Sequence, residues 1–143
     1  MPERSRDWLD QAHRDLASAR WSLEGGFFEW TCFSCQQAAE KAIKAVFHRL
    51  GGEAWGHSVL GLLRGLSERV DVPAELRDCA RLLDRFYIPA RYPNGWETGS
   101  PKDYYTREDA ESAVRCGEAI IRFCDGLLAQ PPGGGAPPQG GGR

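Results

Sequence analysis

Cys32 and Cys35 are separated by two residues, a spacing that two kinds of chemical site use. A structural zinc site needs four ligands, usually from two such cysteine pairs or from one pair and two histidines. A redox dithiol lies at the start of a helix that follows a strand. The sequence has no second pair at this spacing, and no strand pattern precedes Cys32. Because cysteine also behaves as a small buried hydrophobe, we interpret both residues as core positions of a helix.

The segment RLLDRFYIPARYP, residues 81–93, combines arginines with aromatic residues. Guanidinium groups bind phosphate through paired hydrogen bonds, and aromatic rings stack on bases. Alternatively, Arg91 pairs with a carboxylate and Tyr92 packs under the loop. Tyr104 and Tyr105 can join the same patch. The arginines and rings of the segment are Arg81, Arg85 and Arg91, and Phe86, Tyr87 and Tyr92.

Three further polar residues could support such a site. His57 lies in the glycine-rich turn GGEAWGHS, residues 51–58, where it either serves a site or helps to cap the helix that begins there. Glu40 and Lys44, four residues apart, either form an exposed ion pair or line a groove that they share with His57 and the Arg91 loop. The sequence contains no glycine-rich phosphate loop and no set of metal ligands, so we expect neither a cofactor nor a metal.

Charge and composition exclude several classes of protein. The chain has 143 residues and a net charge of −2, so attraction for nucleic acid or an anionic membrane would need a local patch. It has no apolar run long enough to cross a membrane and no signal peptide at MPERSRDW, which predicts a cytoplasmic protein. The odd count of five cysteines, their wide spacing and the missing signal argue against a disulfide framework.

Apolar residues recur at three- and four-residue steps through most of the chain, which predicts an all-α domain over residues 1–129. We expect helices near 4–24, 27–50, 57–69, 73–88 and 107–129, an ordered loop at 88–103, and a disordered Pro/Gly-rich tail at 130–143. Thr106 and Asp109 form a capping-box pattern, and Gly117 indicates a close helix contact. Short connections favour antiparallel neighbours, so we predict an up-and-down bundle of about five helices with the second and fifth at its centre.

Several blocks together resemble the HEPN domain family, in particular its small standalone prokaryotic members, over residues 6–128. The resemblance lies in WLDQAHRDLASAR, FFEWTCFSCQQAAEKAIKAVFHRLG, GHSVLGLL, LDRFYIPARYP and YYTREDAESAVRCGEAI. It implies a five-helix bundle that dimerises and binds a nucleotide. It also implies a minimal nucleotidyltransferase as partner, in modules where several HEPN members are RNA-cleaving toxins and the partner is the antitoxin.

The ribonuclease branch of this family uses an Arg-x(4–6)-His motif near the end of the bundle. The histidine acts as acid or base and the arginine stabilises the charge on phosphorus. No histidine follows His57 here, and seven residues separate Arg49 from His57. Arg6 and His13 fit the spacing but lie in the first helix, so we treat that match as chance.

The leading prediction is therefore a HEPN protein without catalysis of its own, which binds a nucleotide or another phosphate-bearing ligand and acts with a nucleotidyltransferase. Arg85, Arg91 and His57 would hold anionic groups, Tyr92 would stack or orient the ligand, and Lys44 would supply a second cation. One alternative is a ribonuclease toxin that cleaves RNA with His57 and either Arg85 or Arg91. Another is a dimerisation module in which the Arg-Tyr-Pro loop is structural.

Overall fold

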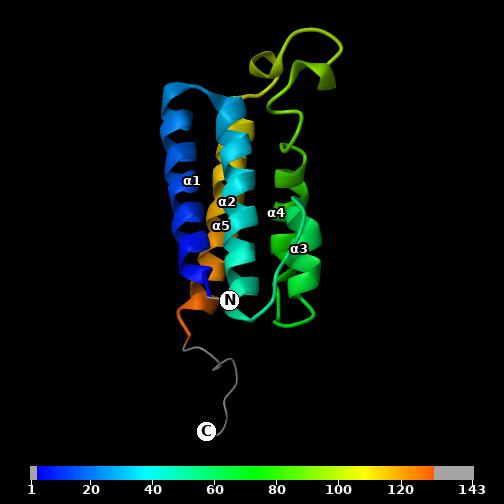
Figure 1. Ribbon diagram of the computed structural model, residues 1–143. Coiled ribbons are helices and arrows are strands. Elements are labelled where there is room, and N and C mark those ends of the chain that lie inside the picture. Colours follow the sequence, from blue (N-terminus) through cyan, green and yellow to red (C-terminus); the bar gives the residue numbers. More distant parts are fainter. Residues whose placement is uncertain (1–2, 131–143) are drawn as a thin grey trace, which may run out of the picture.

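The computed structural model describes residues 3–130, which form five α-helices and two short 3-10 helices without a strand in that range (Figure 1). This confirms the predicted all-α fold. The predicted disordered tail lies outside the described residues, apart from Gln130. The α-helices are α1 (Ser5–Gly25), α2 (Phe28–Arg49), α3 (Val59–Leu66), α4 (Ala74–Asp84) and α5 (Arg107–Leu128), and the 3-10 helices are η1 (Pro93–Gly95) and η2 (Pro101–Asp103).

A tight turn joins α1 to α2 and makes them antiparallel (Figure 1). Gly26 ends α1 in the left-handed region, with φ of 83°, and its N–H donates to the carbonyl of Leu23. Glycine suits this position because it has no Cβ to clash there. The apolar face of α1 packs on α2 through Leu9, Ala12, Leu16 and Ala19, all buried.

The helix α2 is the centre of the bundle, because it contacts each of the other four α-helices. It runs beside α5 in the same direction (Figure 1). Near the middle of the pair, a Cβ added to Gly117 would lie 3.4 Å from Cβ of Cys35, which confirms the predicted close contact. At their C-terminal ends, Nη1 of Arg49 donates to the carbonyl of Leu128 over 3.2 Å. The expectation of antiparallel neighbours concerned helices joined by short connections, and it does not apply to this pair, because α3, α4, η1 and η2 lie between α2 and α5 in the sequence.

Side-chain caps hold two helix starts, and the cap of α3 also joins distant parts of the chain. The predicted capping box of α5 is confirmed, since Oγ1 of Thr106 accepts from the backbone N–H of Asp109, whose carboxylate accepts from that of Thr106. At the start of α3, the Asp84 carboxylate accepts from the backbone N–H groups of Val59 and Leu60, at 2.7 and 3.1 Å, and from the Ser58 hydroxyl. The end of α4 therefore holds the segment that carries His57.

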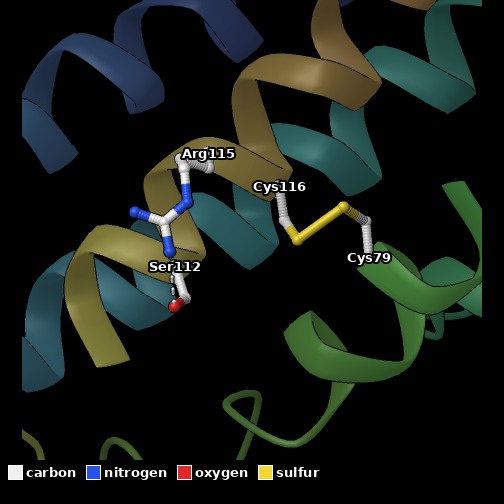
Figure 2. Close-up of a disulfide and its surroundings, with 4 residues drawn as sticks. All are labelled: Cys79, Ser112, Arg115 and Cys116. Atoms are coloured by element: carbon white, nitrogen blue, oxygen red, sulfur yellow. Dashed lines mark hydrogen bonds between the residues drawn. A yellow bond between two sulfur atoms is a disulfide. The ribbon is translucent and has the colours of Figure 1, made fainter. Parts of the chain in front are cut away.

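A disulfide joins Cys79 of α4 to Cys116 of α5, as Figure 2 shows beside the Arg115–Ser112 hydrogen bond. The sequence argued against a disulfide framework, and it did not predict this bond. The two residues are 37 positions apart in sequence, but the packing of α4 on α5 brings their Cα atoms to 5.0 Å. Cys32, Cys35 and Cys124 are free and buried.

Within residues 3–130, no helix combines the length and the apolar character that crossing a membrane requires.

Candidate functional site

A buried carboxylate lies at the centre of a polar cluster on α2. Glu40 is only 4% exposed, and Nζ of Lys44 lies 3.1 Å from its Oε2 atom. The Nδ1 atom of His57 lies 3.1 Å from the same oxygen. A buried charge is stable only when it is paired and hydrogen-bonded, and these two contacts supply that. Glu40 and Lys44 are therefore not the exposed ion pair that the sequence allowed.

Two glutamines extend this cluster and fix the α2–α3 linker. Nε2 of Gln36 donates to the backbone carbonyl of His57 over 2.7 Å, and Nε2 of Gln37 donates to Oε1 of Gln36 over 2.8 Å. Throughout residues 3–130, no fully buried side-chain polar atom lacks a hydrogen-bond partner. We call Gln36, Gln37, Glu40, Lys44 and His57 the α2 polar cluster.

The imidazole of His57 is oriented on one side and open on the other. A carboxylate paired with Lys44 can only accept, so Nδ1 carries the hydrogen that meets Glu40. The ring stacks on Tyr87, with centroids 4.9 Å apart and planes inclined by 18°. The side chain is nonetheless 57% exposed, so Nε2 is the nitrogen left to meet a ligand.

Arg91 contacts the same Tyr87 ring on which His57 stacks. Its Nε donates to the carbonyl of Tyr87 over 2.8 Å. Its Cζ is 4.4 Å from the ring centre of Phe33, 4.7 Å from that of Tyr87 and 5.1 Å from that of Tyr92. Such cation–π contacts hold a guanidinium group without neutralising it. We call Phe33, His57, Tyr87, Arg91 and Tyr92 the His57–Arg91 surface.

The structural alternative for the Arg-Tyr-Pro loop differs from this arrangement. Among residues 3–130, Arg91 is in no ion pair with a carboxylate. Tyr92 is 47% exposed and is not packed under the loop. Beside this surface, Arg91 also lines a small pocket of about 130 Å³ with Trp30, Ser100 and Lys102. Glu29 lines the same pocket, so its walls carry two cations and one anion.

The other two predicted site residues, Arg85 and Lys44, are not part of this surface. Arg85 lines a different pocket, with Trp96 and Tyr104. Lys44 is buried, its ammonium group is paired with Glu40, and it lies 5.8 Å from the ring centre of Trp8.

The cysteines that could have formed a chemical site are packed in the core. Burial raises the pKa of the Cys35 thiol to about 12 and raises the pKa of Cys32 further above its usual range. Both side chains are fully buried, which confirms the interpretation as core positions. Residues 3–130 contain no group of three or more His, Cys, Asp and Glu side chains that could hold a metal.

Sequence reasoning named Tyr87 only as one ring of residues 81–93, without its role as a support, and did not name Asp84. Tyr87 lies beneath both His57 and Arg91, and Asp84 fixes the start of α3. The only available signal was their position within residues 81–93. A groove shared by Glu40, Lys44, His57 and the Arg91 loop was one of the alternatives that the sequence left open. The direct contact between Glu40 and His57 was not predicted, because it spans 17 residues and depends on the path of the linker.

Comparison with known proteins agrees with this fold. A protein of Methanocaldococcus jannaschii, named "Putative toxin MJ1304", is 24% identical over 132 residues, which cover 86% of this chain and 87% of that protein. The crystal structure of TT1696 from Thermus thermophilus matches with a TM-score of 0.86 and 45% identity, covering 89% of this chain and all of that one.

Two further crystal structures carry the family name. ST0689, described as an archaeal HEPN homologue, matches with a TM-score of 0.76 and 39% identity over 89% of this chain and 99% of its own. A HEPN domain protein of Thermotoga maritima matches with a TM-score of 0.73 and 46% identity over 87% of this chain and 99% of its own. The HEPN domain family itself matches residues 5–127, nearly the whole described range. The chain therefore belongs to the HEPN domain family.

Proposed function

We propose that this chain is the HEPN component of a toxin–antitoxin-type module and binds a phosphate-bearing ligand, such as a nucleotide, at the His57–Arg91 surface. The family match and the toxin name of the archaeal relative support the general role. Its partner in such a module would be a minimal nucleotidyltransferase, and the chain itself would form a homodimer.

The observation that carries the proposed site is the setting of Arg91. Within residues 3–130 only its Nε donates a hydrogen bond, to Tyr87, so the two terminal nitrogens remain as a fork for phosphate oxygens. The nearby rings of Tyr87 and Tyr92 offer faces on which a base can stack. His57 adds a second polar contact, and Lys102, whose exposed ammonium group lies 3.3 Å from Oδ1 of Asp103, lines the small pocket with Arg91.

A nucleotide titration of the folded full chain tests the site. We expect ATP or GTP to bind with measurable heat, and Arg91→Ala to weaken binding about tenfold or more, because a hydrogen bond to a charged group contributes roughly 1.5–3 kcal/mol. Arg122→Ala, at an exposed position of α5, is the matched control and should keep the affinity. Equal affinities for the two variants would refute the proposed site. Unfolding of Arg91→Ala would instead support the dimerisation-module alternative.

The partner and the homodimer have separate tests. Light scattering after size-exclusion chromatography should give twice the mass of one chain. Co-expression with a minimal nucleotidyltransferase encoded beside this chain should yield a complex that survives the same column. A monomer, or a nucleotidyltransferase that elutes alone, would contradict the respective proposal.

A second candidate function is RNA cleavage, and the Glu40–His57 contact favours it. Glu40 fixes the tautomer of His57, which leaves Nε2 free to accept the proton of a ribose 2′-hydroxyl. Arg91, next to the same Tyr87 ring, can stabilise negative charge on the phosphate. In this candidate, the pair would replace the Arg-x(4–6)-His motif of the family.

Incubating the purified protein with RNA separates the two candidates. Cleavage that is lost in His57→Ala and kept in His13→Ala would favour the ribonuclease. Loss in His13→Ala alone would assign activity to the Arg6–His13 spacing in α1. Absence of cleavage by the unmodified chain, together with nucleotide binding, would leave the binding function.

A further inference from the structure

The pocket around Arg85 lies outside the His57–Arg91 surface, and nothing in the proposed function uses it. It has a volume of about 390 Å³, within the range typical of small-molecule sites. The end of α4, the 88–106 loop and the first turn of α5 build its walls. The residues that matter for its chemistry are Arg85, Phe86, Trp96, Tyr104, Tyr105 and Asp109.

The aromatic walls of this pocket are fixed in place. Trp96 stacks on Tyr104, with centroids 4.1 Å apart and planes inclined by 8°. The indole Nε1 of Trp96 donates to the carbonyl of Pro89 over 3.0 Å, and the Tyr104 hydroxyl donates to that of Thr98. Tyr105 meets Trp96 edge-on, with centroids 5.8 Å apart. Rings that are already ordered lose little entropy when a flat ligand packs against them.

The polar groups of the pocket have unused hydrogen-bonding capacity. Tyr105 is only 9% exposed as a residue, but every fully buried side-chain polar atom of residues 3–130 has a partner and its hydroxyl has none, so the hydroxyl reaches the open space of the pocket. Burial raises the pKa of Tyr105 to about 12, so the hydroxyl keeps its proton and can donate. A ligand atom that enters the pocket can take the place of the water that meets this hydroxyl and accept its hydrogen bond.

Two charged groups complete the pocket. Arg85 is exposed and is in no ion pair within the described part of the chain, so its guanidinium can meet an anion. The carboxylate of Asp109 accepts from the backbone N–H of Thr106 over 2.9 Å through Oδ2, which leaves Oδ1 as an acceptor. The pocket thus offers flat apolar walls, a hydroxyl donor, a cation and one carboxylate oxygen.

We propose that this pocket binds a small planar aromatic molecule that carries an anionic group. The ring packs against Trp96 and Phe86, the anion meets Arg85, and a polar ring atom takes the hydrogen bond of the Tyr105 hydroxyl. A nucleoside monophosphate and an aromatic carboxylate share this chemistry. The site does not depend on the proposed function, because it uses no residue of the His57–Arg91 surface.

The test is a titration of the full chain with adenosine monophosphate and, separately, with 4-hydroxybenzoate, followed by NMR of the indole N–H groups. We expect at least one probe to shift the Trp96 signal saturably. Arg85→Ala should weaken that binding about tenfold or more, and Tyr105→Phe should weaken it severalfold, because each removes one hydrogen bond to the ligand. Arg81→Ala removes the preceding exposed arginine of α4 and is the matched control.

The outcomes separate the two sites and the two ligand sources. Binding of only one probe identifies the anionic group. Arg91→Ala should leave the Trp96 shift unchanged, whatever it does to nucleotide binding elsewhere. The proposal is overturned if neither probe moves the Trp96 signal saturably, or if Arg85→Ala and Arg81→Ala bind equally well.

Discussion

The Nδ1 atom of His57 lies 3.1 Å from Oε2 of Glu40, so a buried carboxylate sets the direction of an exposed imidazole. The same oxygen accepts from Lys44, which is buried four residues further along α2. Glu40 thus links the stability of the bundle to the orientation of a candidate functional residue.

Replacing Glu40 with Gln preserves the volume of the side chain but leaves the charge of Lys44 buried without a partner. We expect a loss of about 3–5 kcal/mol in the free energy of unfolding, measured by urea denaturation. Adding Lys44→Met should restore most of it. The exposed Arg81–Asp78 pair is the control, and Asp78→Ala should change stability by less than about 1 kcal/mol. If Glu40→Gln and Asp78→Ala lowered the free energy of unfolding by similar amounts, the burial of the Glu40–Lys44 pair would have little effect on stability.

Asp84 is expected to stabilise a helix that lies 25 residues earlier in the chain. Its carboxylate accepts from Val59, Leu60 and Ser58, so Asp84→Ala leaves backbone donors at the start of α3 without a partner. The expected loss is about 1–3 kcal/mol. In the variant, the rate of amide hydrogen exchange should increase more in α3 than in α1. Unchanged protection of α3 would contradict this role.

The disulfide between α4 and α5 predicts a defined thiol count. Without reductant, the denatured chain should expose three thiols, those of Cys32, Cys35 and Cys124. After reduction it should expose all five. The native protein should react slowly, because burial raises the pKa of these three thiols and thiolate is the reactive form. Five reactive thiols in unreduced, denatured protein would show that the bond does not form.

Stability should also depend on that bond. Closing a loop with 37 positions between its ends corresponds to about 4 kcal/mol in the chain-entropy treatment. We expect dithiothreitol to lower the urea midpoint of the native chain. The double variant Cys79→Ser and Cys116→Ser should have the lower midpoint already and should not respond to reductant. An equal response of both proteins would assign the effect to something other than this disulfide.

The raised pKa of Tyr105 predicts that the protein loses stability at alkaline pH. Its pKa is raised from 10.0 to about 12 by burial, so the folded state holds the phenol proton more tightly than the unfolded state does. This contribution is fully present below pH 10.0 and is lost as the pH rises through about 12. Tyr105→Phe should flatten the stability curve in that window. Titration of tyrosinate absorbance should lose its component near pH 12 in the same variant.

Local patterns in the sequence predicted the helices well. The three- and four-residue steps of Leu9, Ala12, Leu16 and Ala19 place the buried face of α1 correctly, because helical periodicity is set by the helix itself. The capping box of α5 was equally visible, since both of its residues lie within one turn. Interactions within one turn leave a readable pattern in the sequence.

Apart from the close helix contact that Gly117 indicated, contacts between distant segments could not be predicted from the sequence. The parallel pairing of α2 and α5 depends on the return path through α3 and α4. The disulfide follows from that packing, and the spacing of its cysteines gives no hint of it. Arg85 and Arg91 are near neighbours in sequence, yet they line different pockets, because α4 ends at Asp84 and the chain changes direction between them.

The two ends of the described chain lie close together. Ser5, Arg49, Leu128 and Ala129 line one pocket, and Figure 1 places that end of the bundle opposite the loop that carries Trp96. A tag or a fused protein attached directly at residue 3 or residue 130 would therefore begin at the end of the bundle opposite Trp96. The same proximity suits a circularly permuted chain, closed by a short linker between residues 130 and 3 and opened near Asn94 in the loop, which would keep every α-helix intact.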